Sequence, residues 1–212
     1  MTWLQTQLTN NPHKLFIQEG NNQYSYSNVM DMVATYSKAL LKEGIQTQDR
    51  ILIYLPSGIE LVEIMLACFE IGAVAVPISL KLTERERNAI IEKIQPQLII
   101  ANWEHKPALI SLSFPLTPIE ELPNASSGCS VITNNYKKNL EDVAAIILTS
   151  GTTGTPKAVQ LSYGNFEASC NNWNNFLQFE SGDQFLCCLP LHHIGGLAVM
   201  LRALMFGFSV NL

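Results

Sequence analysis

Short, uninterrupted apolar runs recur along the chain, and segments with helical periodicity separate several of them. The runs occupy residues 51–55, 73–77, 98–101 and 143–148. Strands that are apolar at every position are typical of parallel sheets, because helical crossovers cover both faces of such sheets. The pattern therefore predicts an α/β fold with a layered α-β-α arrangement and mostly parallel sheets.

Residues that start and stop helices bracket the helical segments. Ser27 is placed to cap a first helix, and Gly44 is placed to close it. Gly72 follows a second helix that spans about 59–71, and Thr83 is placed to cap a third that runs to Ile94. These signals predict where each helix connects to the next strand.

The stretch from about 106 to 139 is rich in Pro, Ser and Asn and is expected to be a connector. A second block follows it, with these expected elements: strands at 143–148, 158–161 and 185–189, a helix opened by Ser162, and an apolar helix that follows Gly195 and Gly196 and ends at Gly207. We therefore expect an N-terminal α/β subdomain with its connector at 1–140, and the start of a second α/β subdomain at 141–212.

Composition excludes several classes of protein. Hydrophobic residues make up 47% and charged residues 15% of the 212, which argues against a disordered tail. The net charge of −5 offers no basic surface for nucleic acid. No apolar run approaches the ~20 residues of a membrane span, and no secretory signal is visible. Five cysteines without a CxxC pair favour buried thiols in a cytoplasmic protein.

Residues 149–157 combine hydroxyls, glycines and a lysine in one loop. The glycines let the backbone approach a ligand closely, and successive backbone N–H groups can form an anion-binding concavity. Hydroxyls can donate to phosphate oxygens, and the lysine adds a positive charge. The residues expected to bind ATP phosphates are Thr149, Ser150, Gly151, Thr152, Thr153, Gly154 and Lys157.

Two other interpretations of this loop can be compared with the phosphate-binding one. A Walker A loop has a glycine before its lysine and Ser or Thr after it, but Pro156 and Ala158 occupy those places. An ordinary polar turn between strands is the other alternative, although such turns rarely combine so many hydroxyls and glycines with a lysine. A polyphosphate-binding loop that differs from a P-loop is therefore favoured.

The loop resembles the signature of the adenylate-forming superfamily, which includes acyl-CoA synthetases, adenylation domains and luciferases. Further segments resemble that family in the same order along the chain: residues 24–26, 49–51, 55–56, 72–77 and 189–196. Ala158 departs from the family pattern, which usually has glycine there. The resemblance implies that the chain is the N-terminal portion of the large domain of such an enzyme.

The resemblance also implies a reaction. A carboxylic acid attacks ATP to give an acyl-adenylate and pyrophosphate, and the thiol of coenzyme A then displaces AMP. Lys157 and Mg²⁺ would stabilise the leaving pyrophosphate. His193 matches the family histidine that lies against the acid, whereas His192 is secondary. Gly195 and Gly196 match the acyl-binding segment.

Arg202 is the one charged residue between His193 and Leu212, and it lies within an apolar helix. A buried guanidinium needs a partner, which is either a carboxylate of the protein or a second carboxylate of the substrate. Residues 189–212 most resemble the o-succinylbenzoate–CoA ligases of menaquinone synthesis, whose substrate is dicarboxylic. That resemblance implies that Arg202 binds the acid.

Several family segments are absent from these 212 residues, including the Tyr-Gly-x-Thr-Glu segment, the ribose-binding aspartate and the C-terminal domain with its lysine. The chain alone is therefore expected to be inactive. Three hypotheses remain open: part of an acid–CoA ligase, part of an adenylation domain that loads a carrier protein, and a non-catalytic nucleotide-binding module.

Overall fold

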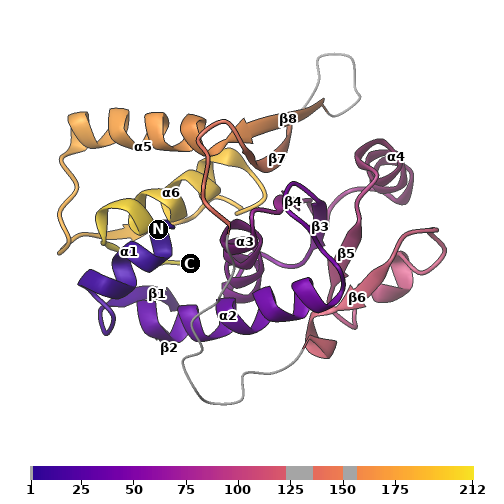
Figure 1. Ribbon diagram of the computed structural model, residues 1–212, viewed down its shortest axis with the longest axis horizontal. Coiled ribbons are helices and arrows are strands. Elements are labelled where there is room, and N and C mark those ends of the chain that lie inside the picture. The colour runs from indigo at the N-terminus through magenta and orange to yellow at the C-terminus, as the bar shows by residue number, and fades with distance from the viewer. Residues whose placement is uncertain (1, 123–135, 150–156) are drawn as a thin grey trace.

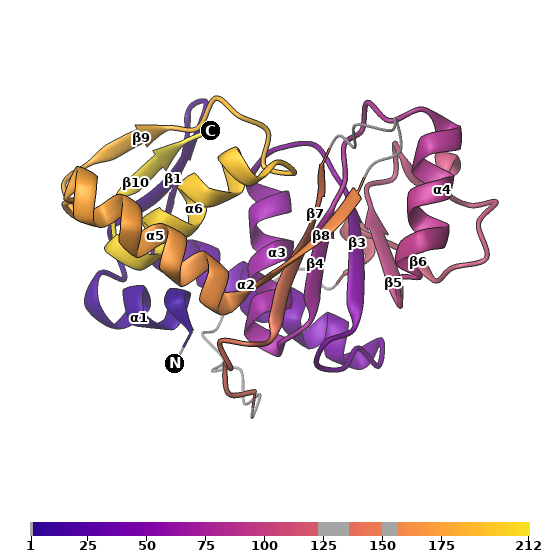
Figure 2. The same cartoon turned by 90° about the horizontal axis from the view of Figure 1, so that it is seen from above.

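The computed structural model describes residues 2–122, 136–149 and 157–212. Two β-sheets lie on either side of a layer of helices (Figures 1 and 2). Six of the eight strand pairings are parallel, which confirms the expected mixed α/β fold with mostly parallel sheets.

The larger sheet has the strand order β6-β5-β3-β4-β7-β8. Its strands are β3 (Arg50–Tyr54), β4 (Val74–Pro77), β5 (Leu98–Ala101), β6 (Leu116–Pro118), β7 (Val143–Thr149) and β8 (Lys157–Ser162). Only β7 and β8 pair antiparallel among them. Successive residues of β3 point to opposite faces, so that Ile51 and Ile53 join one apolar core while Leu52 and Tyr54 join another. Two buried faces explain why the strands are apolar throughout.

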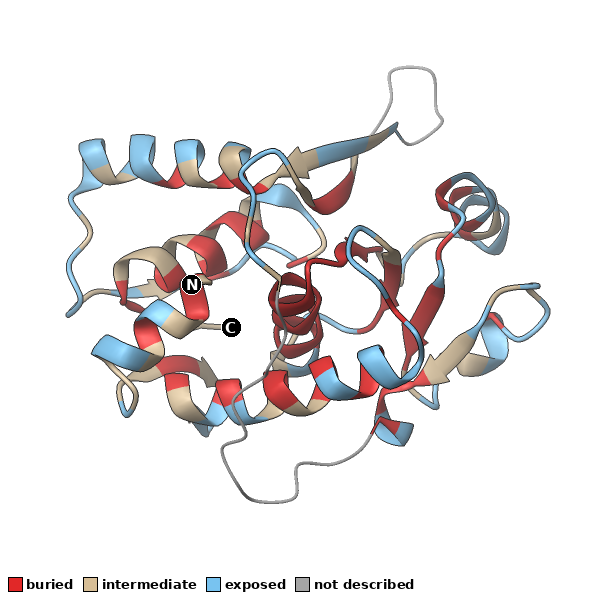
Figure 3. Cartoon of the chain, viewed as in Figure 1, coloured by how far each residue is buried: buried red, intermediate tan, exposed pale blue. Residues whose placement is uncertain are grey.

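The helices cover both faces of this sheet. Helices α2 (Tyr26–Lys42) and α3 (Ile59–Ile71) pack in the core between the two sheets, and α4 (Glu84–Ile94) packs on the opposite face (Figure 2). The central position of α3 is seen in its almost continuous burial (Figure 3). None of the described helices is both long and apolar enough to cross a membrane.

The smaller sheet joins the two ends of the sequence in the order β2-β1-β10-β9. Its strands are β1 (Leu15–Glu19), β2 (Asn22–Ser25), β9 (Gln184–Leu186) and β10 (Ser209–Asn211). The Tyr26 hydroxyl donates to the carbonyl oxygens of Ala203 at 2.9 Å and Phe208 at 3.0 Å, which ties α2 to the end of α6 (Ile194–Phe206). The sheets therefore share one continuous core.

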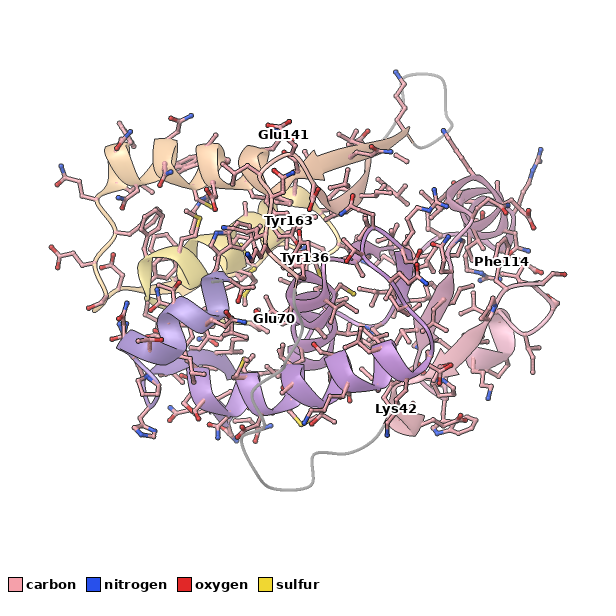
Figure 4. All side chains as sticks on the ribbon, in the orientation of Figure 1. Lys42, Glu70, Phe114, Tyr136, Glu141 and Tyr163 are labelled. Atoms are coloured by element: carbon pink, nitrogen blue, oxygen red, sulfur yellow. The ribbon has the colours of Figure 1, made fainter. Side chains whose placement is uncertain are left out.

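Helix α5 (Tyr163–Leu177) lies against α6 and is anchored at its start. Tyr163 donates to the carbonyl oxygen of Phe69 at 3.3 Å, and its ring lies 6.3 Å from that of Tyr136. Figure 4 shows Tyr136, Tyr163 and Glu70 gathered near the middle of the molecule. Helix α1 (Trp3–Asn10) also reaches this region, where Gln5 donates to the Glu70 carboxylate at 2.7 Å.

Several predicted boundaries are confirmed. Thr83 and Ser162 cap α4 and α5, and Gly72 and Gly207 end α3 and α6 in the left-handed conformation. Gly44, with φ of 83°, follows the end of α2.

The predicted start of the first helix was wrong. Ser25, not Ser27, caps α2, because Ser25 and Asn28 form a reciprocal capping box while the N–H of Ser27 donates to Pro12. Tyr26 then becomes the first helical residue and is fully buried.

Two predictions near the end of the chain also need correction. The strand expected at 185–189 ends at Leu186, because the Cys187 thiol turns inward toward the carbonyl oxygens of Leu189 and Gly196. Gly195 and Gly196 lie inside α6 and do not precede it.

The expected connector at 106–139 contains the edge strand β6 and the 3-10 helices Lys106–Ala108 and Ile119–Glu121. The division of the chain at residue 140 stays a prediction. Both sheets take strands from each side of that position.

Candidate functional site

The carboxyl edge of the larger sheet contains a topological switch point. The connection from β3 to β4 passes through α3 on one face, and the connection from β4 to β5 passes through α4 on the other. Strand β5 then pairs with the opposite side of β3. Ligands of open α/β sheets bind outside the carboxyl ends of the strands at such a point. The loops after β3, β4 and β7 all leave from this edge, since the three strands are parallel neighbours.

The predicted phosphate loop connects β7 to β8. Thr149 and Lys157 are paired across the two strands, and both are exposed. The Thr149 hydroxyl donates to the carbonyl oxygen of Lys157 at 3.4 Å. The structure therefore brings together the two ends of the loop. The intervening predicted residues lie outside the described part of the chain: Ser150, Gly151, Thr152, Thr153 and Gly154.

The predicted acyl-binding segment docks against the same edge. The N–H of Leu191 donates to the hydroxyl of Ser57, in the loop after β3, at 3.2 Å. His193 is exposed and stands at the N-cap of α6 without a side-chain capping bond. Its backbone N–H donates to the carbonyl oxygen of Pro190 at 3.0 Å, which sets the turn into the helix. The imidazole of His193 is thus presented at the start of α6.

The glycines of α6 allow a close turn beneath this histidine. A Cβ added to Gly196 would lie 2.5 Å from the carbonyl oxygens of both Leu189 and Pro190. The corresponding Cβ of Gly195 would meet only the end of the Leu189 side chain at 2.6 Å. Gly196 is therefore required by backbone packing, whereas the conflict at Gly195 involves a movable side chain.

His192 is half-buried beside His193, with ring centroids 4.3 Å apart. Burial lowers the pKa of His192 to about 4, with smaller contributions from His193 and Lys81. Lys81 follows β4, and its positive charge makes the smallest of these contributions. At neutral pH His192 is an uncharged imidazole.

Arg202 lies on α6 against α5. Its guanidinium carbon is 4.7 Å from the centroid of the Trp173 ring. Burial lowers the pKa of Arg202, and its buried Nε has no hydrogen-bond partner among the described residues. The described ion pairs involve other residues, so the first of the two alternatives for Arg202, an ion pair with a carboxylate of the protein, is not found in this part of the chain. The face of the Trp173 indole ring contacts the guanidinium instead.

Two contacts were missed by sequence reasoning. Ser57 could have been noticed as a hydroxyl in a turn after an apolar strand, a position where ligands often bind. The sequence pattern did not indicate Trp173, since its contact with Arg202 depends on how α5 packs on α6. Within residues 2–122, 136–149 and 157–212 no group of three or more His, Cys, Asp or Glu side chains could hold a metal ion.

Comparison with solved structures supports the fold. The o-succinylbenzoate coenzyme A synthetase of Bacillus subtilis, solved in complex with AMP, superposes with a TM-score of 0.90 at 24% identity, covering 100% of this chain and 55% of that one. VinN superposes with a TM-score of 0.88 at 22% identity, covering 99% of this chain and 55% of that one. At such identities the likeness shows the fold alone.

Sequence comparison identifies the family. A 2-succinylbenzoate–CoA ligase of Oceanobacillus iheyensis is 31% identical over 209 residues, which are 98% of this chain and 43% of the relative. One from Staphylococcus aureus is 28% identical over 238 residues, covering 99% of this chain and 46% of the relative. The chain thus spans less than half the length of these curated relatives. The family described as AMP-binding enzyme matches residues 4–212, and the chain belongs to that family.

Proposed function

We propose that the chain supplies the phosphate-binding and acyl-binding segments of an ATP-dependent acid–CoA ligase that works in the cytoplasm. One observation carries this proposal. The Thr149–Lys157 hairpin and the segment that presents His193 belong to the same carboxyl edge of the larger sheet. A polyphosphate and an organic acid could therefore be held side by side.

In the proposed reaction, a carboxylate oxygen of the acid attacks the α-phosphorus of ATP, and the bond to the pyrophosphate oxygen breaks. Lys157 and the loop hydroxyls would bind the departing phosphates and offset their growing negative charge. Mg²⁺ bound with ATP would share this charge neutralisation. The thiol of coenzyme A would then attack the acyl carbon, lose its proton and displace AMP.

The acid would lie along the start of α6. His193 would contact its reacting carboxylate, and the backbone of Gly195 and Gly196 would line the site beside it. Arg202 would bind a second carboxylate in a bidentate manner. We propose o-succinylbenzoate, a dicarboxylic acid and an intermediate of menaquinone synthesis, because the similar proteins from O. iheyensis and S. aureus are 2-succinylbenzoate–CoA ligases.

The test measures pyrophosphate release by the protein encoded in the full reading frame that contains these residues. ATP and o-succinylbenzoate should give pyrophosphate, and Lys157→Ala should slow its release at least tenfold. Lys42→Ala is the matched control, because Lys42 is an exposed lysine at the end of α2. The proposal would be contradicted if no carboxylic acid supported pyrophosphate release, or if Lys157→Ala kept full activity.

A further inference from the structure

The surroundings of Arg202 are unusual for a half-buried cation. Trp173 of α5 packs against this guanidinium, and Cys170 lies one turn earlier on the same helix. The nearest acidic residue of that helix, Glu167, accepts hydrogen bonds from Trp3 and Lys138. Helix α5 therefore offers Arg202 an indole ring but uses its carboxylate elsewhere.

A guanidinium in this position has unused hydrogen-bonding capacity. Its Nε is buried without an acceptor among the described residues, and leaving a charged donor unsatisfied is costly. The ring of Trp173 attracts the positive charge through its face but accepts no in-plane hydrogen bond. A planar anion such as a carboxylate could satisfy this in-plane donor.

Helix geometry relates Arg202 to the acyl-binding segment. Gly195 and Arg202 are seven residues apart, which is close to two turns, so they share one side of α6 with a rise of about 10 Å between them. Long helical side chains lean toward the N-terminus of their helix, which brings the guanidinium back toward His193. The proposed site for a second carboxylate would therefore lie on the side of α6 that carries Gly195.

We infer that Trp173 is a specificity-determining positioning residue, which holds the Arg202 guanidinium so that it selects acids with a second carboxylate. This inference rests on the proposed acid–CoA ligase function. Stacking on the indole fixes the plane of a side chain that otherwise has many rotamers, and less freedom is lost when the carboxylate binds.

The first test compares acids in steady-state pyrophosphate release by the protein of the full reading frame. Trp173→Leu should raise the KM for o-succinylbenzoate about tenfold with little change in kcat, whereas Trp173→Phe should recover most of the loss. 3-Benzoylpropanoate and 2-butanoylbenzoate each lack one carboxylate, and only the one that keeps the reacting carboxylate can release pyrophosphate. The KM for that acid should be unchanged, because it lacks the carboxylate that Arg202 would bind.

Trp103→Leu is the matched control, because Trp103 is also half-exposed and stacks with a cation, Lys106, at 4.3 Å. An equal loss with dicarboxylic and monocarboxylic acids would mean that Trp173 is merely structural, and no loss would mean that it does not position Arg202. Either result overturns the inference and leaves the ligase proposal intact.

A second test needs no catalysis and uses the protein of the full reading frame. The Nε–Hε resonance of Arg202 is followed by NMR while o-succinylbenzoate or 3-benzoylpropanoate is added. The inference is supported if only the dicarboxylic acid shifts this resonance. Trp173→Leu should raise the acid concentration that gives half of the shift about tenfold. Absence of that selectivity overturns it, even if pyrophosphate release fails for other reasons.

Discussion

Thr149 and Lys157 hold the two ends of the predicted phosphate loop together, through a 3.4 Å hydrogen bond from the threonine hydroxyl to the lysine carbonyl oxygen. They are also strand partners, so the loop begins and ends at one pair of neighbouring backbone positions. A short, fixed base favours an anion-binding loop, because the backbone N–H groups can converge on the ligand.

Replacing Thr149 by valine keeps the β-branched shape and removes the hydroxyl. We expect ATP to bind several-fold more weakly, because both a phosphate donor and the bond at the loop base are lost. The free energy of unfolding should change by less than about 1 kcal/mol, since Thr149 is exposed. ATP titration and urea unfolding measure the two effects. Thr6→Val, at another exposed threonine with a backbone bond, should leave ATP affinity unchanged.

The two glycines of α6 should respond differently to alanine. Gly196→Ala would press a Cβ against two backbone carbonyl oxygens and should lower the free energy of unfolding by about 1–3 kcal/mol. Gly195→Ala meets only the flexible, half-exposed side chain of Leu189 and should cost less than about 1 kcal/mol. Urea unfolding of both variants measures the difference. Equal costs would show that the turn beneath His193 relaxes easily.

Much of the larger sheet could be predicted because its local signals agree with its tertiary structure. Apolar runs mark β3, β4, β5 and β7, and capping residues mark the helix between β4 and β5. The smaller sheet was harder to predict. Strand β1 pairs in parallel with β10, almost two hundred residues away, and such a pairing leaves no local pattern.

The candidate site, like the fold, has features that local sequence predicts and features that depend on tertiary packing. The loop ends were predicted from residue types and spacing, since the residues expected to bind phosphate are consecutive in the sequence. His193 was predicted from the family resemblance alone. The hydrogen bond from Leu191 to Ser57 was not foreseen, because it joins residues 134 positions apart. The same is true of Trp173 and Arg202, whose contact depends on the packing of α5 against α6.

His192 should titrate well below an ordinary histidine. Burial, His193 and Lys81 lower its folded pKa to about 4 from an ordinary 6.5, so the unfolded state binds more protons between these values. Stability should therefore fall as the pH drops from about 6.5 to 4, by roughly 1 kcal/mol once solvent screening of this half-buried side chain is considered. Urea unfolding of wild type and His192→Gln across this range measures the effect. Lys81→Met should raise the His192 pKa in NMR titrations.

Glu63 should give the opposite pH dependence. Its side chain is buried in α3, and burial, together with Glu60 and Glu19, raises its folded pKa to about 8 from an ordinary 4.5. The folded state then binds more protons than the unfolded state between these values, so this contribution to stability is complete below about pH 4.5 and is lost as the pH rises to about 8.

The loss attributable to Glu63 should reach on the order of 2–4 kcal/mol. Glu63→Gln keeps the shape of the protonated form, so its free energy of unfolding should vary less with pH and exceed that of wild type at pH 8. Glu60→Gln serves as the matched comparison, because removing one neighbouring charge should lower the Glu63 pKa without abolishing the dependence. Parallel unfolding curves of wild type and Glu63→Gln from pH 5 to 8 would show that the Glu63 carboxylate is hydrated in the folded protein.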